Sequence, residues 1–285
     1  MIEFIHDLQT YAFLQKAFTT SIMVGVICGV IGSFIVLRGM ALMGDAISHA
    51  ILPGVAISYM LGINYFYGAV LTGVLTAFGI GAITQNSRIK SDSSIGLVFS
   101  AFFALGIILI NRAKSATDLT QILFGNVLAV RNSDMWLTLA IGGLVLLVVI
   151  IFYKELLISS FDETMAAAYG LPTRLIHYAI MFLLTLVTVA SLQTVGVILV
   201  VSLLITPAST AYLMTNRLSV MVVLSAIFGA LSAVIGLYFS FLYNMPSGPV
   251  IALVTTALFV LAFLFSPKQG LLVRKLKSAN RKRYA

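Results

Sequence analysis

Long apolar runs separated by short polar segments make up most of the chain. A helix needs about 20 apolar residues to cross the hydrocarbon core of a bilayer, and most of these runs approach or exceed that length. The pattern therefore predicts an all-α polytopic membrane protein with eight to nine transmembrane helices in one domain, 1–285. The predicted spans are 17–37, 40–61, 66–84, 95–111, 135–153, 175–192, 194–214, 219–242 and 249–266.

Composition agrees with a membrane protein and argues against a nucleic-acid partner. The chain is 60% hydrophobic and 9% charged, whereas a soluble domain is about 25% charged. The net charge of +8 comes largely from the tail at 267–285, which has no acidic residue. Such a tail marks the cytoplasmic side of a membrane and can contact anionic lipid. Its basic residues are Lys268, Arg274, Lys275, Lys277, Arg281, Lys282 and Arg283.

The orientation follows from counting the spans back from this tail. The segments 85–94 and 154–174 then lie inside, while the N-terminus and the loop 112–134 lie outside. Arg112, Lys114 and Arg131 are basic residues that fall on the outer side against the trend. Residues 1–15 have the pattern of an interfacial amphipathic helix. Part of the 112–134 loop, LTQILFGNVLAV, is too short to span and is expected to be re-entrant or to lie on the surface.

Two ionisable residues stand inside the apolar run at 40–61. Asp45 and His49 are four positions apart, so they share one face of a helix. A carboxylate at the centre of a membrane helix costs roughly 2.5–3.5 kcal/mol on insertion scales, which makes the pair a candidate functional site. The residues alone leave three readings open: a structural hydrogen bond, a proton relay, or half of a divalent-metal site.

The residues after His49 set the surroundings of this pair. Pro53 has no N–H, so the carbonyl of His49 loses its helical donor and is free for a water or a metal. Gly54 continues a row of small residues with Ala46 and Ala50, which lets another helix pack close. The other histidines, His6 and His177, are not placed at mid-membrane. Any further ligands would be oxygens, waters or groups from a second copy across a two-fold axis.

Two further segments have distinctive patterns. In the inner segment 154–174, Asp162 and Glu163 precede a short alanine-rich run that ends at Gly170, which predicts a short helix with an acidic start and a glycine stop. Taken by itself this is an ordinary connecting helix. The span 194–214 contains Pro207, which is expected to kink or break it. The chain has no phosphate-binding GxxxxGK[ST] loop, so any ATP hydrolysis belongs to another chain.

The stretch RGMALMGDAISHAILPGVA, from Arg38 to Ala56, resembles the signature of the permease subunits of metal-cation ATP-binding-cassette importers of the manganese, zinc and iron class. The likeness extends over essentially the whole chain. It includes FDETMAAAYG at 161–170, VGVILVVSLLITPAST at 195–210 and the basic tail.

This resemblance implies a homodimeric permease with the fold of the cobalamin and siderophore importers. It implies Asp45 and His49 as intramembrane metal ligands, and 154–174 as the cytoplasmic coupling segment. Within that segment Asp162, Glu163, Ala166 and Gly170 would meet the ATPase.

The partners implied are a cytoplasmic ATPase dimer and an extracellular metal-binding lipoprotein. The resemblance also implies a multi-pass protein of the plasma or inner membrane that is not itself an enzyme and holds no permanent cofactor. The form GDAISHAILPG is more like manganese or iron members than zinc members, so Mn²⁺ is the expected cargo, with Zn²⁺ or Fe²⁺ as alternatives. A proton-coupled secondary carrier and a membrane scaffold are the alternatives from other classes.

Overall fold

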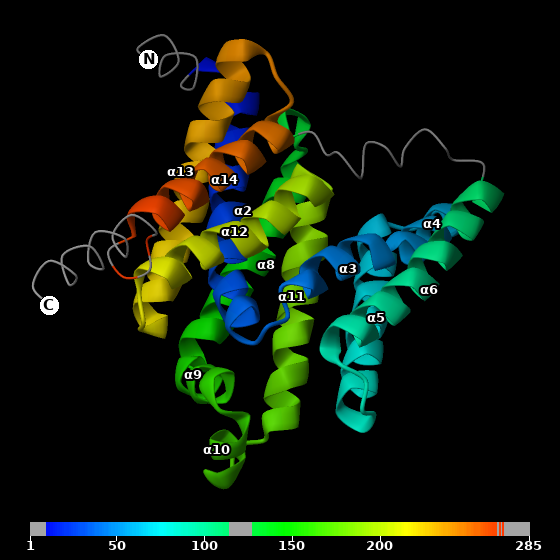
Figure 1. Ribbon diagram of the computed structural model, residues 1–285. Coiled ribbons are helices and arrows are strands. Elements are labelled where there is room, and N and C mark those ends of the chain that lie inside the picture. The colour runs from blue at the N-terminus through cyan, green and yellow to red at the C-terminus, as the bar shows by residue number, and fades with distance from the viewer. Residues whose placement is uncertain (1–9, 114–126, 267, 269, 271–285) are drawn as a thin grey trace, which may run out of the picture.

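The computed structural model describes residues 10–113, 127–266, 268 and 270, and most of this part of the chain is helical (Figure 1). Two short helices, α3 and α4, take the place of one predicted span. The helices are α2 (Ala12–Leu37), α3 (Leu42–Ala50), α4 (Leu52–Leu61), α5 (Tyr65–Asn86), α6 (Ser91–Ala113), η1 (Val127–Ala129), α8 (Asn132–Ile151), α9 (Tyr153–Phe161), α10 (Glu163–Ala168), α11 (Thr173–Val195), α12 (Val197–Met214), α13 (Leu218–Tyr243) and α14 (Ser247–Phe265).

Among the described residues, eight helices are long and apolar enough to cross a membrane: α2, α5, α6, α8 and α11–α14. The all-helical polytopic architecture is therefore confirmed. The first helix begins at Ala12, so 12–15 belong to a long helix and not to the expected interfacial helix. The remainder of that expectation, on 1–9, lies outside the described residues. So do 114–126 of the expected re-entrant segment and most of the basic tail 267–285.

The prediction of one continuous span over 40–61 is wrong. The run forms α3 and α4, which are separated at Ile51. Pro53 occupies the first turn of α4, where its missing N–H costs nothing, and its ring cannot follow His49 in an unbroken helix. The hydroxyl of Thr72 on α5 donates to the carbonyl of Ile51 at 3.3 Å and so supports the backbone at the break.

Gly54 then holds α4 tightly against α5. A Cβ at Gly54 would collide with the carbonyl of Gly68 and with the Thr72 hydroxyl. The glycine thus allows backbone-to-backbone contact, as the small-residue pattern predicts for this helix.

The expected interruption of 194–214 occurs at Gly196, not at Pro207. Gly196 joins α11 to α12 with φ 82° and ψ 166°, a conformation that residues with a Cβ rarely adopt. Pro207 lies buried within α12, which continues to Met214. Close packing against α2 accounts for the continuation of α12 through Pro207. The two backbones touch one turn before the proline, where a Cβ at Gly32 would collide with the carbonyl of Leu204.

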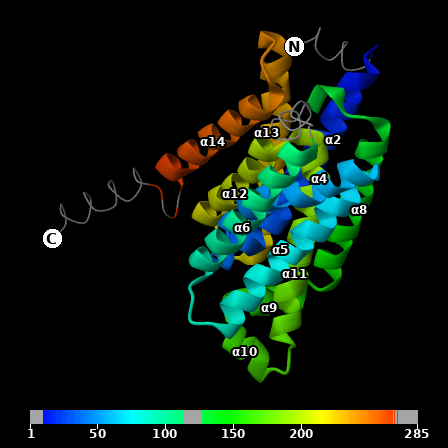
Figure 2. The same ribbon diagram turned by 90° about the vertical axis from the view of Figure 1, so that its right-hand side faces the viewer.

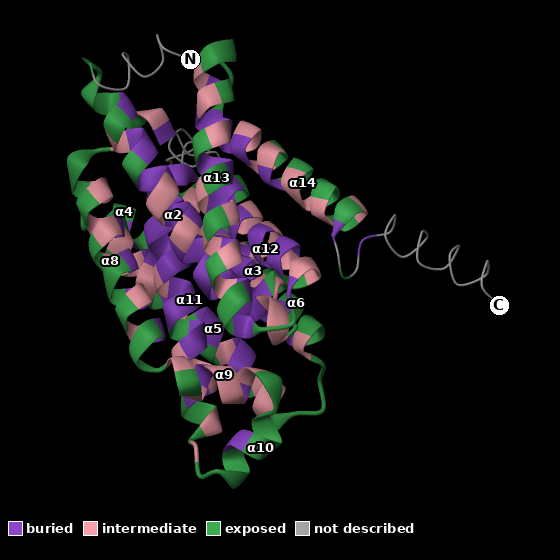
Figure 3. Ribbon diagram, turned by 90° about the vertical axis from the view of Figure 1, so that its left-hand side faces the viewer, coloured by how far each residue is buried: buried purple, intermediate pink, exposed green. Residues whose placement is uncertain are grey.

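The helices fall into two groups that meet along α11. Helices α3–α6 pack mainly on one another, whereas α2, α12, α13 and α14 form the other group (Figure 1). Helices α2 and α11 are the most buried of the long helices, and Figure 3 shows the exposed residues gathered on the outer helices and on α10. Helix α3 contacts α5 and α6 in its own group but also α11 and α12, so it lies in the seam between the groups.

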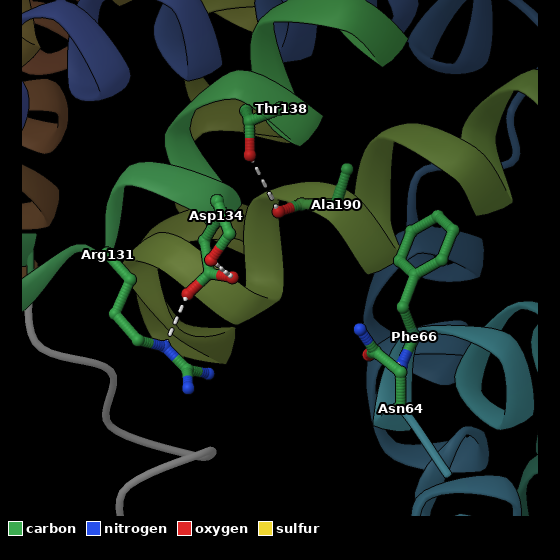
Figure 4. Close-up of polar contacts among 7 residues, drawn as sticks. Asn64, Phe66, Arg131, Asp134, Thr138 and Ala190 are labelled. Carbon is green, nitrogen blue, oxygen red and sulfur yellow. Dashed lines mark hydrogen bonds and ion pairs between the residues drawn. The ribbon is translucent and has the colours of Figure 1, made fainter.

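Polar contacts hold the end of the molecule that lies opposite α10. Arg131 pairs with Asp134 at 3.1 Å in the first turn of α8, and Thr138 donates to the carbonyl of Ala190 on α11 at 3.2 Å (Figure 4). The side chain of Asn64 caps α5 by accepting the N–H of Phe66. The ion pair offsets the charge of Arg131, one of the three basic residues that ran against the predicted orientation.

Candidate functional site

Asp45 and His49 lie on one face of α3, as their spacing predicts. The Nε2 atom of His49 is 3.5 Å from Oδ1 of Asp45. The Asp45 side chain is 47% exposed and the His49 side chain 27% exposed. The two groups are therefore neighbours that face the same open space.

Two phenylalanines of α6 hold the imidazole in place. The ring of His49 makes edge contacts with Phe99 and Phe103, at centroid distances of 6.0 and 5.8 Å. These two rings stack on each other at 5.5 Å. The Nδ1 atom of His49 is enclosed and, within the described part of the chain, has no hydrogen-bond partner. Only Nε2, the nitrogen nearer Asp45, is therefore directed toward the open side.

The rest of α3 is closed. Among its residues only Leu42, Asp45 and His49 are not buried, and their spacing of three and four positions forms a single stripe. Because α5, α6, α11 and α12 pack around the other faces, this stripe is the one open side of the helix. A carboxylate exposed in this way cannot remain against lipid, so water or another protein must cover it.

The distance between the two groups suits neighbouring ligands of one metal ion. With metal–ligand bonds of about 2.2 Å, two adjacent ligands lie roughly 3.1–3.6 Å apart, and the pair here is at 3.5 Å. No group of three or more His, Cys, Asp or Glu residues that could hold a metal occurs in the described ranges. Asp45 and His49 could therefore offer a metal ion two ligands, and a complete site would need oxygens from elsewhere.

Helix α12 carries a row of hydroxyls. Ser202, Thr206 and Ser209 are half-buried and are spaced four and three positions apart, on the side of α12 that faces away from α2. Helix α12 meets α3 where Leu204 packs against Gly44, the residue before Asp45. Ser202 and Thr206 are each two positions from Leu204, about 200° around the helix, so they point away from the face of α12 that meets α3.

The segment after α9 forms the short helix that the sequence predicts. Asp162 caps α10 by accepting the N–H of Met165 at 2.9 Å and the hydroxyl of Thr164 at 2.5 Å. Gly170 stops the helix with φ 79°, and the N–H of Leu171 reaches back to the carbonyl of Ala166 at 3.1 Å. These hydrogen bonds, led by that from Thr164, hold the pKa of the Asp162 carboxyl below its usual range.

Of the four residues chosen on the sequence, Asp162, Glu163 and Gly170 are exposed, but Ala166 is not. Ala166 is fully buried, so it anchors α10 to the protein and does not face a partner. The large exposed side chains are Phe161, Met165 and Tyr169, at 61%, 50% and 69%. Met165 and Tyr169 are four positions apart and lie along one side of α10, whereas Phe161 ends α9 and is separated from α10 by the extended Asp162. The sequence analysis did not select these exposed apolar side chains, although the four-residue spacing of Met165 and Tyr169 can be seen in the sequence.

The comparisons with known proteins give a consistent result. A profile described as the ABC 3 transport family matches residues 10–266. The chain belongs to this family. The family inferred from the sequence is therefore confirmed, and the chain is a multi-pass membrane permease whose family leaves ATP hydrolysis to a separate subunit.

Several relatives match over nearly their whole length. The manganese transport system membrane protein MntC of Listeria innocua is 65% identical over 96% of this chain and 98% of its own. A probable iron transport system membrane protein of Haemophilus influenzae is 39% identical over 98% of this chain and 99% of its own. The structure of PsaBC from Streptococcus pneumoniae in complex with a Fab matches with a TM-score of 0.87 at 53% identity, covering 97% and 100%.

The hydrogen bonds of Asp162 lead to a prediction about α10. A carboxyl whose pKa is lowered by folding stabilises the helix above its unfolded pKa, and this contribution is lost as the pH falls through the lower, folded value. At neutral pH, Asp162→Ala removes the cap. We expect exchange of the Met165 amide hydrogen to become about three- to tenfold faster, the effect of losing an N-cap.

Hydrogen-exchange mass spectrometry of the peptide that contains Met165 measures this effect. Asp162→Asn is the matched control, because its side-chain oxygen can still accept the Met165 N–H. Equal exchange rates in Asp162→Ala and the unmodified chain would show that the cap does not hold α10.

Proposed function

We propose that this chain is the membrane-spanning subunit of an ATP-driven importer that carries Mn²⁺ into the cell. The observation that carries the proposal is the Asp45–His49 pair, which opens to one side of an otherwise buried helix inside the membrane domain. The names of the relatives support it, since the Listeria innocua protein is called a manganese transport system membrane protein.

The ligand chemistry of the site fits this cargo. A carboxylate oxygen, hydroxyls and waters suit Mn²⁺, and the imidazole of His49 also accepts Zn²⁺ or Fe²⁺. An ion held by two protein ligands and several exchangeable oxygens can leave again, as transport requires, whereas a closed cage of four protein ligands would retain it.

A second copy of the chain would close the site. Asp45 is half-exposed on the face of the protomer formed by α3, α6 and α12, where lipid would be a costly neighbour. A two-fold axis in front of this face would bring two Asp45–His49 pairs to one pathway. The permease would then act as a homodimer, with the ion moving between the two protomers.

The energy would come from a pair of ATPase subunits in the cytoplasm. Helix α10 projects at one end of the molecule (Figure 3). The exposed apolar side chains Phe161, Met165 and Tyr169 lie on it or next to its ends, together with the acidic Asp162 and Glu163. Apolar side chains next to acidic ones suit a groove lined by apolar and basic residues. This end is then cytoplasmic, as is the C-terminal tail, and an extracellular lipoprotein would deliver the ion at the opposite end.

The alternative cargoes and mechanisms that the sequence left open differ in the residues and in the partner subunit that they require. A zinc or iron importer would use the same two residues, and the Haemophilus influenzae relative carries an iron name. A proton-coupled secondary carrier would need no ATPase subunit. Uptake of Mn²⁺, Zn²⁺ and Fe²⁺ measured side by side, with and without the ATPase partner, separates these cases.

Removal of either ligand should abolish transport. In cells that depend on this chain for manganese, Asp45→Ala and His49→Ala should each lower Mn²⁺ accumulation at least about tenfold, because loss even of an outer-shell metal contact costs that much. Radiometric or elemental measurement of cell-associated manganese gives the result.

The matched control is Asp92→Ala, which removes an exposed carboxylate at the start of α6. It should leave accumulation unchanged. The amount of each variant in the membrane is measured in parallel. If Asp45→Ala or His49→Ala accumulated near-normal Mn²⁺, these residues would not be the ligands.

The proposed dimer leads to a cross-linking prediction. Leu42 is 54% exposed on the same stripe as Asp45, so Leu42→Cys should join two protomers through a bifunctional thiol reagent in native membranes. Native Cys28 is buried, which keeps the background low. The control is Ile150→Cys, 74% exposed on α8, which Figure 2 shows on the side away from α12 and α14. Equal yields from the two variants would contradict the proposed axis.

A further inference from the structure

Arg38 connects two parts of the chain that are far apart in sequence. It occupies the turn between α2 and α3, and its side chain extends to α9. Its Nη2 atom donates to Oγ of Ser159 at 2.6 Å, and its Nε atom donates to Oγ of Ser160 at 3.2 Å. A planar guanidinium with two fixed donors thus joins the start of the metal-bearing helix to the helix that precedes α10.

The charge of Arg38 makes this contact costly to break. The side chain is half-buried, and burial lowers the pKa of its guanidinium. Glu163, at the start of α10, acts in the opposite direction through its negative charge. A partly buried cation needs its hydrogen bonds, because an unpartnered one is strongly unfavourable. Arg38 is therefore expected to follow Ser159, Ser160 and Glu163 when these move.

Hydrogen bonds restrain the backbone of the turn that contains Arg38. Gly39 has φ 67°, and the N–H of Met40 donates to the carbonyl of Ile35 at 3.0 Å. The N–H of Met43 then donates to the carbonyl of Met40 at 3.0 Å, at the start of α3. Asp45 follows within the first turn of that helix. A displacement of Arg38 would thus move the start of α3 and, with it, Asp45.

Few residues separate the serines that bind Arg38 from α10. Ser160 is two residues before Asp162, the cap of α10. One link between the proposed coupling helix and the Asp45–His49 pair consists of α9, the two hydrogen bonds of Arg38, and the α2–α3 turn. The remaining route from α10 to α3 runs through α11, which packs on both.

We propose that Arg38 is a positioning residue that transmits the movement of α9 and α10 to α3, and so opens or closes the Asp45–His49 site in step with the ATPase. This inference rests on the proposed function. It assigns to Arg38 a role in coupling and none in binding the ion. If Arg38 only stabilised the fold, its loss would lower the amount of intact complex, and transport and ATP hydrolysis would decline together.

The test uses the full permease with its ATPase subunits and binding protein, reconstituted in lipid vesicles. Mn²⁺ uptake and ATP hydrolysis are measured in the same vesicles, which gives the number of ions moved per ATP. We expect Arg38→Ala to lower this ratio about tenfold, the equilibrium change expected when a hydrogen bond to a charged group is lost. Arg38→Lys, which keeps the charge without the two-donor fork, should restore it in part.

Two further variants make the result decisive. The double variant Ser159→Ala/Ser160→Ala keeps Arg38 and removes its two acceptors, and it should lower the ratio as Arg38→Ala does. If the Arg38→Ala permease does not assemble with its ATPase subunits, the double-serine variant still tests the proposal. Arg217→Ala, which removes an exposed arginine between α12 and α13, is the matched control and should keep the normal ratio.

The outcomes separate this inference from the proposed function. A normal ratio of ions to ATP in Arg38→Ala and in the double-serine variant would overturn the coupling role while the importer stands. Transport and hydrolysis that decline in proportion would also overturn it. If the unmodified complex moved no Mn²⁺, the proposed function would be wrong and the inference would fall with it.

Discussion

The arrangement of the molecule depends on one constraint: a carboxylate in the middle of a membrane domain must be kept from lipid. Helix α3 meets this constraint by burying every residue except Leu42, Asp45 and His49. Helices α5, α6, α11 and α12 surround the other sides, and Phe99 and Phe103 enclose the imidazole. The polar pair is left with a single open direction. What covers this open side decides whether the pair is purely structural or lines a pathway for an ion.

Glycines that admit close neighbours help to set the positions of α3 and α4. Gly44 admits Leu204 of α12, and Gly54 brings α4 onto Gly68 of α5. Helix α3 ends before Ile51 and lies in the seam between the two helix groups. A short helix in such a seam contacts both groups, so a shift of one against the other changes its surroundings directly. This position suits a site that must open to each side of the membrane in turn.

Much of the fold could be predicted from the sequence, because apolar runs of membrane length specify helices almost by themselves. The Asp45–His49 pair was also visible, since its four-residue spacing survives the break at Ile51, which lies beyond both residues. The break itself was foreseeable only in part from Pro53. The sequence suggested an interruption at Pro207, but tight packing on α2 carries α12 through it, and the glycine at 196 makes the turn instead.

Features that depend on distant contacts escaped sequence reasoning. Nothing near Arg38 points to serines 121 and 122 positions away. The burial of Ala166 follows from how α10 rests on its neighbours, and the same docking exposes Met165 and Tyr169. The stacked Phe99 and Phe103 read as ordinary apolar residues of α6 until the structure brings them to His49. Local pattern predicts elements, whereas the surroundings of a site emerge from packing.

The central claim is that Asp45 and His49 bind the ion together, and pulsed electron paramagnetic resonance of Mn²⁺ tests it most directly. With the purified chain in lipid nanodiscs and stoichiometric Mn²⁺, the account predicts a nitrogen coupling from one imidazole, lost in His49→Ala. Asp45→Ala should weaken Mn²⁺ binding while any remaining bound ion keeps that coupling. A spectrum of fully hydrated Mn²⁺ in the unmodified chain, or a nitrogen coupling that persists in His49→Ala, would contradict the account.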